Sequence, residues 1–286
     1  MKTTRDPDSA AATILWGTAA ALVLAVPAAV MAQSLQAPPA ASAARPPGPG
    51  AKPDWSFRLG AGALYQPEYE GSDEYTVLPL PMLMVSYRDL VFLRGPMLGA
   101  NAFTWQGAAG RLQVGPLLRY QLGRYDDDSD DLRGMGDIDG SVELGGFITY
   151  GLGPWSAGVA AFRDVSGSHE GLTAKLSAGN RLSLGPRLLL RSEISTTWAD
   201  DNYTETFFGV TRTQSARSGL RQYRPDGGFK DAGITLDLDY SLSERWGITG
   251  RVAYKRMLGD AADSPLVKDR GSADQFSTGF FISYRF

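Results

Sequence analysis

The last twelve residues, 275–286, alternate with a period of two, and this pattern constrains the fold most strongly. In a β-strand, successive side chains point to opposite faces. One face of this segment is mainly aromatic and aliphatic, and the other is mostly polar or small. The same pattern recurs upstream. Apolar side chains toward lipid, alternating with polar ones toward a lumen, are typical of a transmembrane β-barrel. The residues on the mainly aromatic and aliphatic face are Phe276, Thr278, Phe280, Ile282, Tyr284 and Phe286.

The alternating segments predict an all-β fold, a single antiparallel transmembrane barrel over residues 55–286. We count about twelve strands, with ten as the alternative, because a single-chain barrel needs an even number. Residues 90–106 are divided at Gly95-Pro96 into two short strands. Pro79 and Pro81, within segment 76–87, remove two hydrogen-bond donors and predict an irregular strand edge there.

Loop lengths predict the orientation of the barrel, because outer-membrane barrels have short periplasmic turns and longer extracellular loops. The long loop 200–228 is expected to be partly ordered and to fold over the barrel mouth. Four tryptophans at periplasmic strand ends predict an interfacial aromatic girdle: Trp55, Trp105, Trp155 and Trp246. The short turns are 88–89, 107–110, 152–154, 185–186 and 243–245, and the long loops are 67–75, 125–138, 200–228 and 259–273.

The first 32 residues predict a cleaved signal peptide, with Lys2 and Arg5 before the apolar run 14–26. Small residues near Ala32 provide the cleavage site, and an uncleaved anchor is the alternative. Residues 33–54 are rich in alanine and proline and are expected to form a disordered linker. The chain is therefore expected to enter the bacterial outer membrane after export.

Composition argues against several functions. The chain has no cysteine and a single histidine, His169, so a zinc site lacks ligands and no cofactor is expected. The net charge of −3 argues against a nucleic-acid partner. A Ser-His-acid site at His169 would need partners that converge in space, and its sequence neighbours Ser168 and Glu170 point apart. We therefore do not expect this protein to be an enzyme. The acidic run 126–131 could bind Ca²⁺, but a solvated loop beside lipopolysaccharide is the favoured interpretation.

The strand register sends a set of charged residues into the lumen. Two interpretations stay open: a self-neutralising network that fills a small barrel, and a narrow basic path for anionic solutes. The short turn 243–245 predicts that Asp237 lies opposite Arg251 and Asp239 opposite Thr249. The expected network comprises Arg58, Arg119, Glu143, Arg191, Glu193, Asp237, Asp239, Arg251 and Lys255.

Several motifs occur in order along the chain: GALYQPEYEGSDEY (62–75), LRGMGDID (132–139), Phe208-Gly209-Val210 with Gln214, Ser218-Gly219-Leu220, Tyr223, and LGDAADSP (258–265), with Met135 standing where leucine is expected. Through these motifs the chain resembles the MipA/OmpV family of outer-membrane proteins. The resemblance implies an outer-membrane barrel that acts as a scaffold joining a lytic transglycosylase to a murein synthase. Its expected partners are outer-membrane lipid, lipopolysaccharide, the barrel assembly machinery and murein-remodelling enzymes, and a narrow channel for small anionic solutes is the alternative function. A terminal strand with Phe280, Ile282, Tyr284 and Phe286 is similar to the assembly signal of such barrels.

Overall fold

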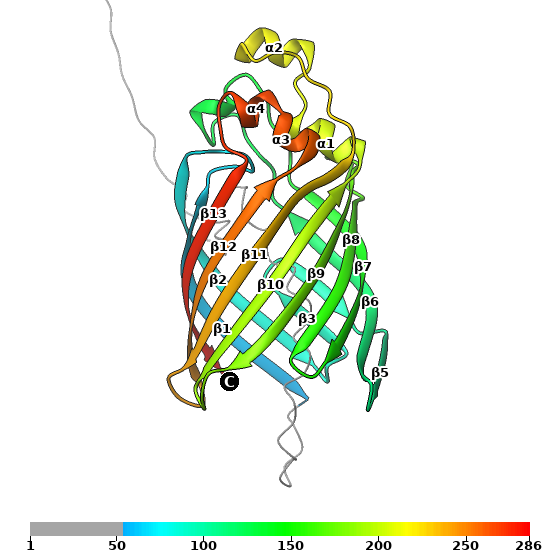
Figure 1. Cartoon of the computed structure of the whole chain (residues 1–286), viewed down its shortest axis with the longest axis vertical. Coiled ribbons are helices and arrows are strands. Elements are labelled where there is room, and N and C mark those ends of the chain that lie inside the picture. Colours follow the sequence, from blue (N-terminus) through cyan, green and yellow to red (C-terminus); the bar gives the residue numbers. More distant parts are fainter. Residues whose placement is uncertain (1–53) are drawn as a thin grey trace, which may run out of the picture.

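The computed structural model describes residues 54–286, which form one β-barrel with helices gathered over one end (Figure 1). The expected signal peptide and, apart from Asp54, the expected linker lie outside the described residues. None of the helices in the described part of the chain is long and apolar enough to cross a membrane.

Within residues 54–286, thirteen strands form a single antiparallel sheet, with five short helical segments in the loops between them. The strands are β1 (Trp55–Pro67), β2 (Tyr75–Tyr87), β3 (Val91–Arg94), β4 (Met97–Ala100), β5 (Phe103–Gly107), β6 (Gly110–Gln121), β7 (Ser141–Leu152), β8 (Trp155–Asp164), β9 (Leu172–Ser183), β10 (Leu188–Ala199), β11 (Gly228–Ser241), β12 (Trp246–Met257) and β13 (Asp274–Arg285). The helices are η2 (Asp130–Leu132), α1 (Asp201–Phe208), α2 (Arg212–Ser218), α3 (Gly259–Asp263) and α4 (Pro265–Lys268).

The sheet closes on itself as a twelve-stranded barrel, which confirms the predicted fold. β1 pairs with both β2 and β13, and β4 pairs with β6. β4 and β5 lie one after the other along the same edge of β6, so they count as one broken strand. The break lies at Asn101, whose backbone N–H donates to the carbonyl of Leu90 at 2.7 Å. The predicted division at Gly95-Pro96 falls between β3 and β4.

One stretch of the barrel wall lacks a partner on one side. β2 pairs with β1 along its whole length but with β3 only over its last four residues, Met84–Tyr87. Among the described residues, segment 75–82 therefore pairs on the β1 side alone. Pro79 and Pro81 suit this free edge, because proline has no N–H to leave unpaired. The irregular edge predicted from these prolines is confirmed.

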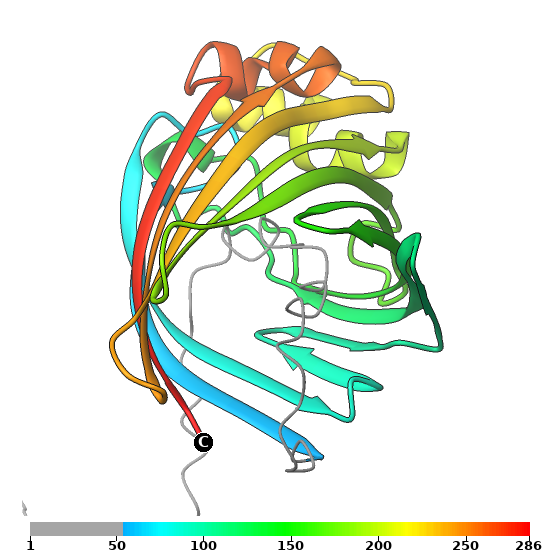
Figure 2. The ribbon, with the colours of Figure 1, turned by 60° about the horizontal axis from the view of Figure 1, so that its bottom comes forward.

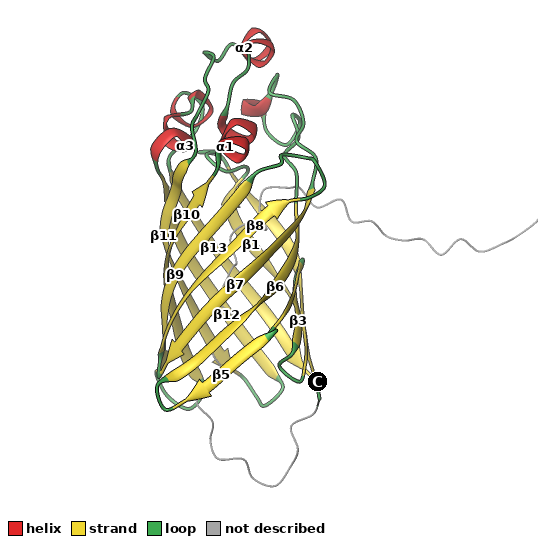
Figure 3. Cartoon of the chain, turned by 90° about the vertical axis from the view of Figure 1, so that its right-hand side faces the viewer, coloured by secondary structure: helices red, strands yellow, loops and turns green. Residues whose placement is uncertain are grey.

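Apart from the two-residue turn Gly95-Pro96 between β3 and β4, the connections within residues 54–286 divide by length between the two ends of the barrel, and the helices described there lie at one end (Figure 3). At the other end the described residues form short turns, and the C-terminal residue lies there too (Figure 1). At Arg88-Asp89 both residues have positive φ, 48° and 56°, as a tight hairpin turn of the mirror-image type requires. Since long loops of outer-membrane barrels are extracellular, the turn end faces the periplasm.

Four long loops pack into a single cap over the extracellular end. One buried cluster joins α1, α3 and α4 to the strand ends through Phe207, Phe208, Met257, Ala261 and Val267. A second joins all four loops, and apolar burial is the main stabilising term for such a layer. The cap therefore has its own hydrophobic core. The second cluster contains Tyr69, Leu132, Met135, Val210, Leu220 and Leu266.

Hydrogen bonds between loops hold the cap together. Ser264 Oγ donates to the carbonyl of Phe208 at 2.7 Å, and Gln214 Nε2 donates to the carbonyl of Met135 at 2.6 Å. Arg124 donates to the carbonyl of Phe207 at 2.6 Å, at the C-terminal end of α1, where a cation is favoured. Burial lowers the pKa of Arg124 to about 10, so it stays charged at neutral pH.

A surface-labelling experiment tests this orientation. Because the chain has no natural cysteine, a maleimide can react only with an introduced one. An Ala216→Cys variant, in the exposed part of α2, should react with a membrane-impermeant maleimide on intact cells. The matched control is Glu244→Cys in the exposed turn after β11, which should react only after the outer membrane is permeabilised. The opposite pattern of labelling would reverse the orientation.

Candidate functional site: the barrel lumen

The barrel encloses a cavity of about 1510 Å³ that extends from the periplasmic turns to the underside of the cap. Figure 2 views the barrel with its turn end brought forward. At the turn end the lining includes Gly153, Pro186 and Ser243. At the cap end it includes Tyr203 of α1 and Lys230 of β11. The lumen is thus a well that reaches the periplasmic side, and the cap lies across its other end.

Charges at the cap end form a balanced cluster of acids and lysines. Lys230 Nζ lies 2.6 Å from Glu70 Oε1 and 2.8 Å from Asp231 Oδ2. Lys255 Nζ lies 2.7 Å from the same Glu70 oxygen. Burial alone would raise the pKa of Glu70, but the charges of Lys230 and Lys255 outweigh it and hold the pKa below its usual range. Two cations and two anions thus neutralise one another under the cap.

Lys230 belongs to this cluster because of a β-bulge that sequence alternation does not reveal. In the β10–β11 ladder Thr197 faces Asp231, whereas Trp198 faces Phe229, so Lys230 is the extra residue. A bulge places two residues opposite one and reorients a side chain. Both Lys230 and Asp231 are buried, although strict alternation would send one of them toward lipid. The sequence feature that could have indicated this bulge is the pair of charged neighbours, Lys230 and Asp231, at the start of the strand.

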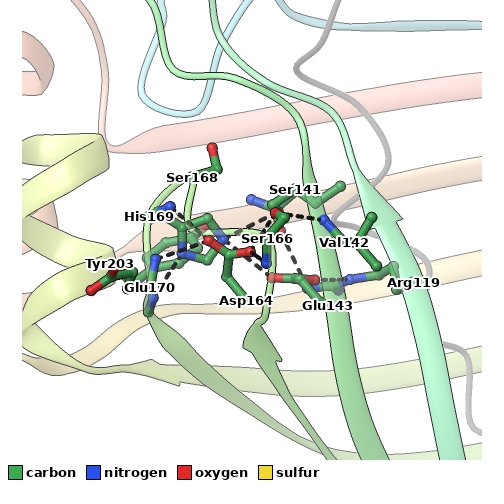
Figure 4. A network of polar contacts seen from close by, with 12 residues as sticks. Arg119, Ser141, Val142, Glu143, Asp164, Ser166, Ser168, His169, Glu170 and Tyr203 are labelled. Carbon is green, nitrogen blue, oxygen red and sulfur yellow. Dashed lines mark hydrogen bonds and ion pairs between the residues drawn. The ribbon is translucent and has the colours of Figure 1, made fainter.

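A second buried network joins β6, β7 and the loop after β8 (Figure 4). Arg119 Nε donates to Glu143 Oε2 at 2.5 Å, and Glu143 is fully buried. His169 Nε2 lies 3.5 Å from the other Glu143 oxygen and 3.3 Å from Ser141 Oγ. Arg119 also lies over the ring of Phe162, with its guanidinium carbon 4.0 Å from the ring centroid. The structure thus joins two expected lumen residues to the single histidine.

The geometry around His169 is not that of a nucleophilic triad. The ring Nδ1 accepts a hydrogen bond from the backbone N–H of Gly171 at 3.0 Å, so the hydrogen sits on Nε2. That nitrogen faces Ser141 and Glu143 and therefore cannot take a proton from the serine. Ser141 and His169 are both buried, which also keeps them from a substrate. The network joins strands and loop and has the character of a structural contact.

The acidic run before η2 is organised by its own backbone. Asp126 accepts hydrogen bonds from the N–H groups of Gly134, Met135 and Gly136 at 2.9–3.1 Å. These bonds help to lower the pKa of Asp126 against the opposing effect of desolvation. Its carboxylate therefore closes the loop 125–138, and this use accounts for the first aspartate of the run.

The periplasmic half of the lumen carries a surplus of arginine. Arg58 of β1 stands opposite Arg285 of β13, and Arg181 of β9 stands opposite Arg191 of β10. Like charges directly opposite on neighbouring strands repel. Six arginines and two aspartates make up this arginine cluster, which leaves four positive charges. Its members are Arg58, Arg94, Arg181, Arg191, Arg251, Arg285, Asp237 and Asp239.

The two aspartates are held within this cluster. Asp237 faces Arg251 in the ladder and Asp239 faces Thr249, so the register predicted from turn 243–245 is confirmed. Arg251 donates to both oxygens of Asp237, at 2.6 and 3.1 Å. Arg191 lies 2.7 Å from Asp239 and 3.7 Å from Asp237. Asp237 is only 1% exposed, so its charge depends on these arginines.

Removing one partner of the Asp237–Arg251 pair should cost more stability than removing both. Arg251→Ala leaves a buried carboxylate short of a partner, whereas adding Asp237→Ala removes the uncompensated charge. We expect a coupling energy of about 0.5–3 kcal/mol in a double-mutant cycle measured by urea unfolding. Nearby Arg191 should keep the value below that of an isolated pair. A coupling near zero would show that the two side chains do not act together.

The structure brings the expected lumen residues together in two groups. Lys175 and Glu193 pair at 2.8 Å in the cap-side half, and Arg119 pairs with Glu143 there. Sequence reasoning missed Arg94, on a strand too short for a reliable register, and Glu70, in a loop. The tryptophans at the turn end, together with Phe280 and Phe286, lie exposed on the outer face, and Ile282 and Tyr284 share their strand.

The four motifs that carry the family resemblance come together in the cap and its supporting strands. Tyr69, Leu132, Val210 and Leu266, or their immediate neighbours, belong to these motifs and share one buried cluster. The signature is thus a set of loops that pack against each other.

Residues 59–286 match the family described as MltA-interacting protein MipA. The chain is 29% identical over 238 residues to the MltA-interacting protein of Escherichia coli, covering 80% of this chain and 90% of that protein. It is 27% identical over 163 residues to outer membrane protein OmpV of Vibrio cholerae, covering 57% and 61%. Among solved structures, the NanC porin aligns with a TM-score of 0.41 and 9% identity, over 79% of this chain and 98% of that one. Since the match spans the whole barrel, this outer-membrane chain belongs to the MipA family.

Proposed function

We propose that this barrel is a scaffold of the cell envelope that presents its periplasmic end to murein-remodelling enzymes. The observation that carries the proposal is the cap, because its packed core lies across the extracellular end of the lumen. The lumen and the short turns remain accessible from the periplasm. A relative carries the name MltA-interacting protein, and we extend that class of partner, a murein hydrolase and with it a synthase, to this chain.

Recovery of partners from cross-linked envelopes tests the scaffold. An affinity tag inserted in α2, on the extracellular side, leaves the periplasmic end untouched. We expect a lytic transglycosylase among the recovered proteins, and its loss in a variant that combines Glu244→Ala with Arg245→Ala at the exposed turn. The matched control is Arg212→Ala, which is exposed on the cap. Recovery of the assembly machinery alone would contradict the scaffold.

The arginine cluster favours a second candidate, a narrow channel for small anionic solutes. Planar-bilayer recordings distinguish the two functions. A scaffold closed by its cap should give no steady conductance, whereas a variant lacking residues 203–226 should conduct anions through the exposed lumen. Steady anion-selective conductance of the unaltered protein would favour the channel.

A further inference from the structure

The inner face of β2 is apolar, in contrast to the charged wall across the lumen. Leu78, Leu80, Met82 and Met84 alternate with side chains that point outward, and Leu80, Met82 and Met84 line the cavity. Segment 78–84 spans about 20 Å of strand, at roughly 3.3 Å per residue. The lumen thus contains a long apolar strip on a wall where other barrels place polar residues.

Neighbouring strands deepen this strip into a trough. Gly60 and Gly62 of β1 stand opposite Met82 and Leu80, so no side chain from β1 projects over them. A Cβ at Gly62 would overlap the ring of Phe281, which lies beside it on β13 and lines the same cavity. The trough is therefore bounded by the apolar strip of β2 on one side and by the ring of Phe281, which covers Gly62, on the other.

The periplasmic end of the trough is bounded by arginines. Met84 stands opposite Arg58 on β1 and opposite Arg94 on β3. Arg58 in turn stands opposite Arg285, so three arginines, on β13, β1 and β3, surround the lower end of the strip on β2. Two of them are directly opposed like charges, an arrangement that an anion between them would relieve. Arginine is suited to binding carboxylate and phosphate oxygens.

We propose that the lumen binds a single-chain amphiphile with an anionic head, which Arg58, Arg94 and Arg285 hold while the acyl chain lies along β2. The edge at residues 75–82, which has no neighbouring strand on one side among residues 54–286, supports an apolar chain over a small soluble anion, because an acyl chain could lie against it. Consecutive residues 80–86 all line the cavity, which fits an opening beside this edge. The inference does not depend on the scaffold role.

Binding can be followed with an environment-sensitive fluorophore on a single introduced cysteine in protein reconstituted into phosphatidylcholine nanodiscs. The label of a Met82→Cys variant lies in the trough, and that of the matched control Val77→Cys lies on the lipid-facing side of the same strand, outside the cavity lining. Titration with palmitate should change the emission saturably at the first position only. Hexadecanol tests the need for the charged head, and acetate tests the need for the chain.

The arginines are tested by combining Arg58→Gln with Arg94→Gln. This change should weaken palmitate binding at least about tenfold and leave any response to hexadecanol unaltered, because only the head loses its charged hydrogen bonds. Heat-modifiable gel migration confirms that each variant is folded. Equal responses to palmitate and hexadecanol would overturn the role of the arginines. Competition by acetate at the same concentration as palmitate would overturn the acyl-chain site, and so would an unresponsive label.

Discussion

Loss of the Arg119 guanidinium should destabilise the barrel by about 3–5 kcal/mol, because it strands a fully buried carboxylate. Glu143 is 0% exposed and Arg119 only 6%, so solvent cannot replace the missing charge. Arg119 is the only arginine or lysine that Glu143 contacts among the described residues. The Arg119–Glu143 ion pair is thus deeply buried, and Glu143 has few other groups with which to pair.

The substitutions should preserve shape, so that packing and charge are separated. Arg119→Met keeps the contact with the Phe162 ring, and Glu143→Gln keeps the size of the acid. We expect Arg119→Met alone to lower the free energy of unfolding in urea more than the two changes together. The control is Arg133→Ala, which breaks an ion pair with Asp130 on the exposed cap and should have no measurable effect.

A different ranking would contradict this account. If Arg119→Met and the double variant were equally stable, the buried carboxylate would have found another partner or a proton. A shift in the unfolding curve of Arg119→Met with pH would identify the proton, because protonated Glu143 carries no charge to strand.

Alternation of apolar and polar residues was enough to predict the barrel and its twelve strands. It succeeds because each strand crosses between two different media, lipid and lumen, so a slip of one residue would place charges in lipid. Arg251 shows this constraint: one register puts it beside Asp237, and the neighbouring register puts it outside.

Alternation fails where the chain leaves the regular ladder. Lys230 enters the lumen through a bulge, and β4 and β5 share one partner strand after a break at Asn101. Both features depend on contacts between residues far apart, which a single sequence does not encode in a fixed period. The same holds for Glu70, a loop residue that reaches two lysines on β11 and β12.

The cap is the largest part that residue patterns alone could not build. Its helices are short, three to eight residues, and such segments gain stability from tertiary packing rather than from propensity. α2 has a local signal, the capping box of Thr211 and Gln214, but nothing local places it over Met135. The motifs of the family resemblance marked these loops as important without revealing that they pack together.

The closing strand leads to the second large effect: loss of Phe286 should prevent assembly into the outer membrane. Phe286 is 70% exposed on the lipid side, and its ring centroid lies 4.8 Å from that of Tyr284. Its backbone N–H donates to the carbonyl of Phe57 at 3.1 Å, so the last residue ties the closing seam between β13 and β1. We expect that deleting Phe286, or Phe286→Asp, leaves unassembled protein in the periplasm.

The control must separate a recognition signal from the general cost of a charge beside lipid. Leu152 is 52% exposed at the same end of the barrel, on β7, so Leu152→Asp places an equal charge at a similar depth. Near the interface such a charge costs only about 0–1 kcal/mol, too little to block folding. We therefore expect Leu152→Asp to reach the outer membrane and to migrate as a heat-modifiable barrel, while Phe286→Asp does not. If both variants assembled equally well, the terminal aromatic would be one more lipid-facing side chain, because a recognition signal must depend on its position at the end of the chain.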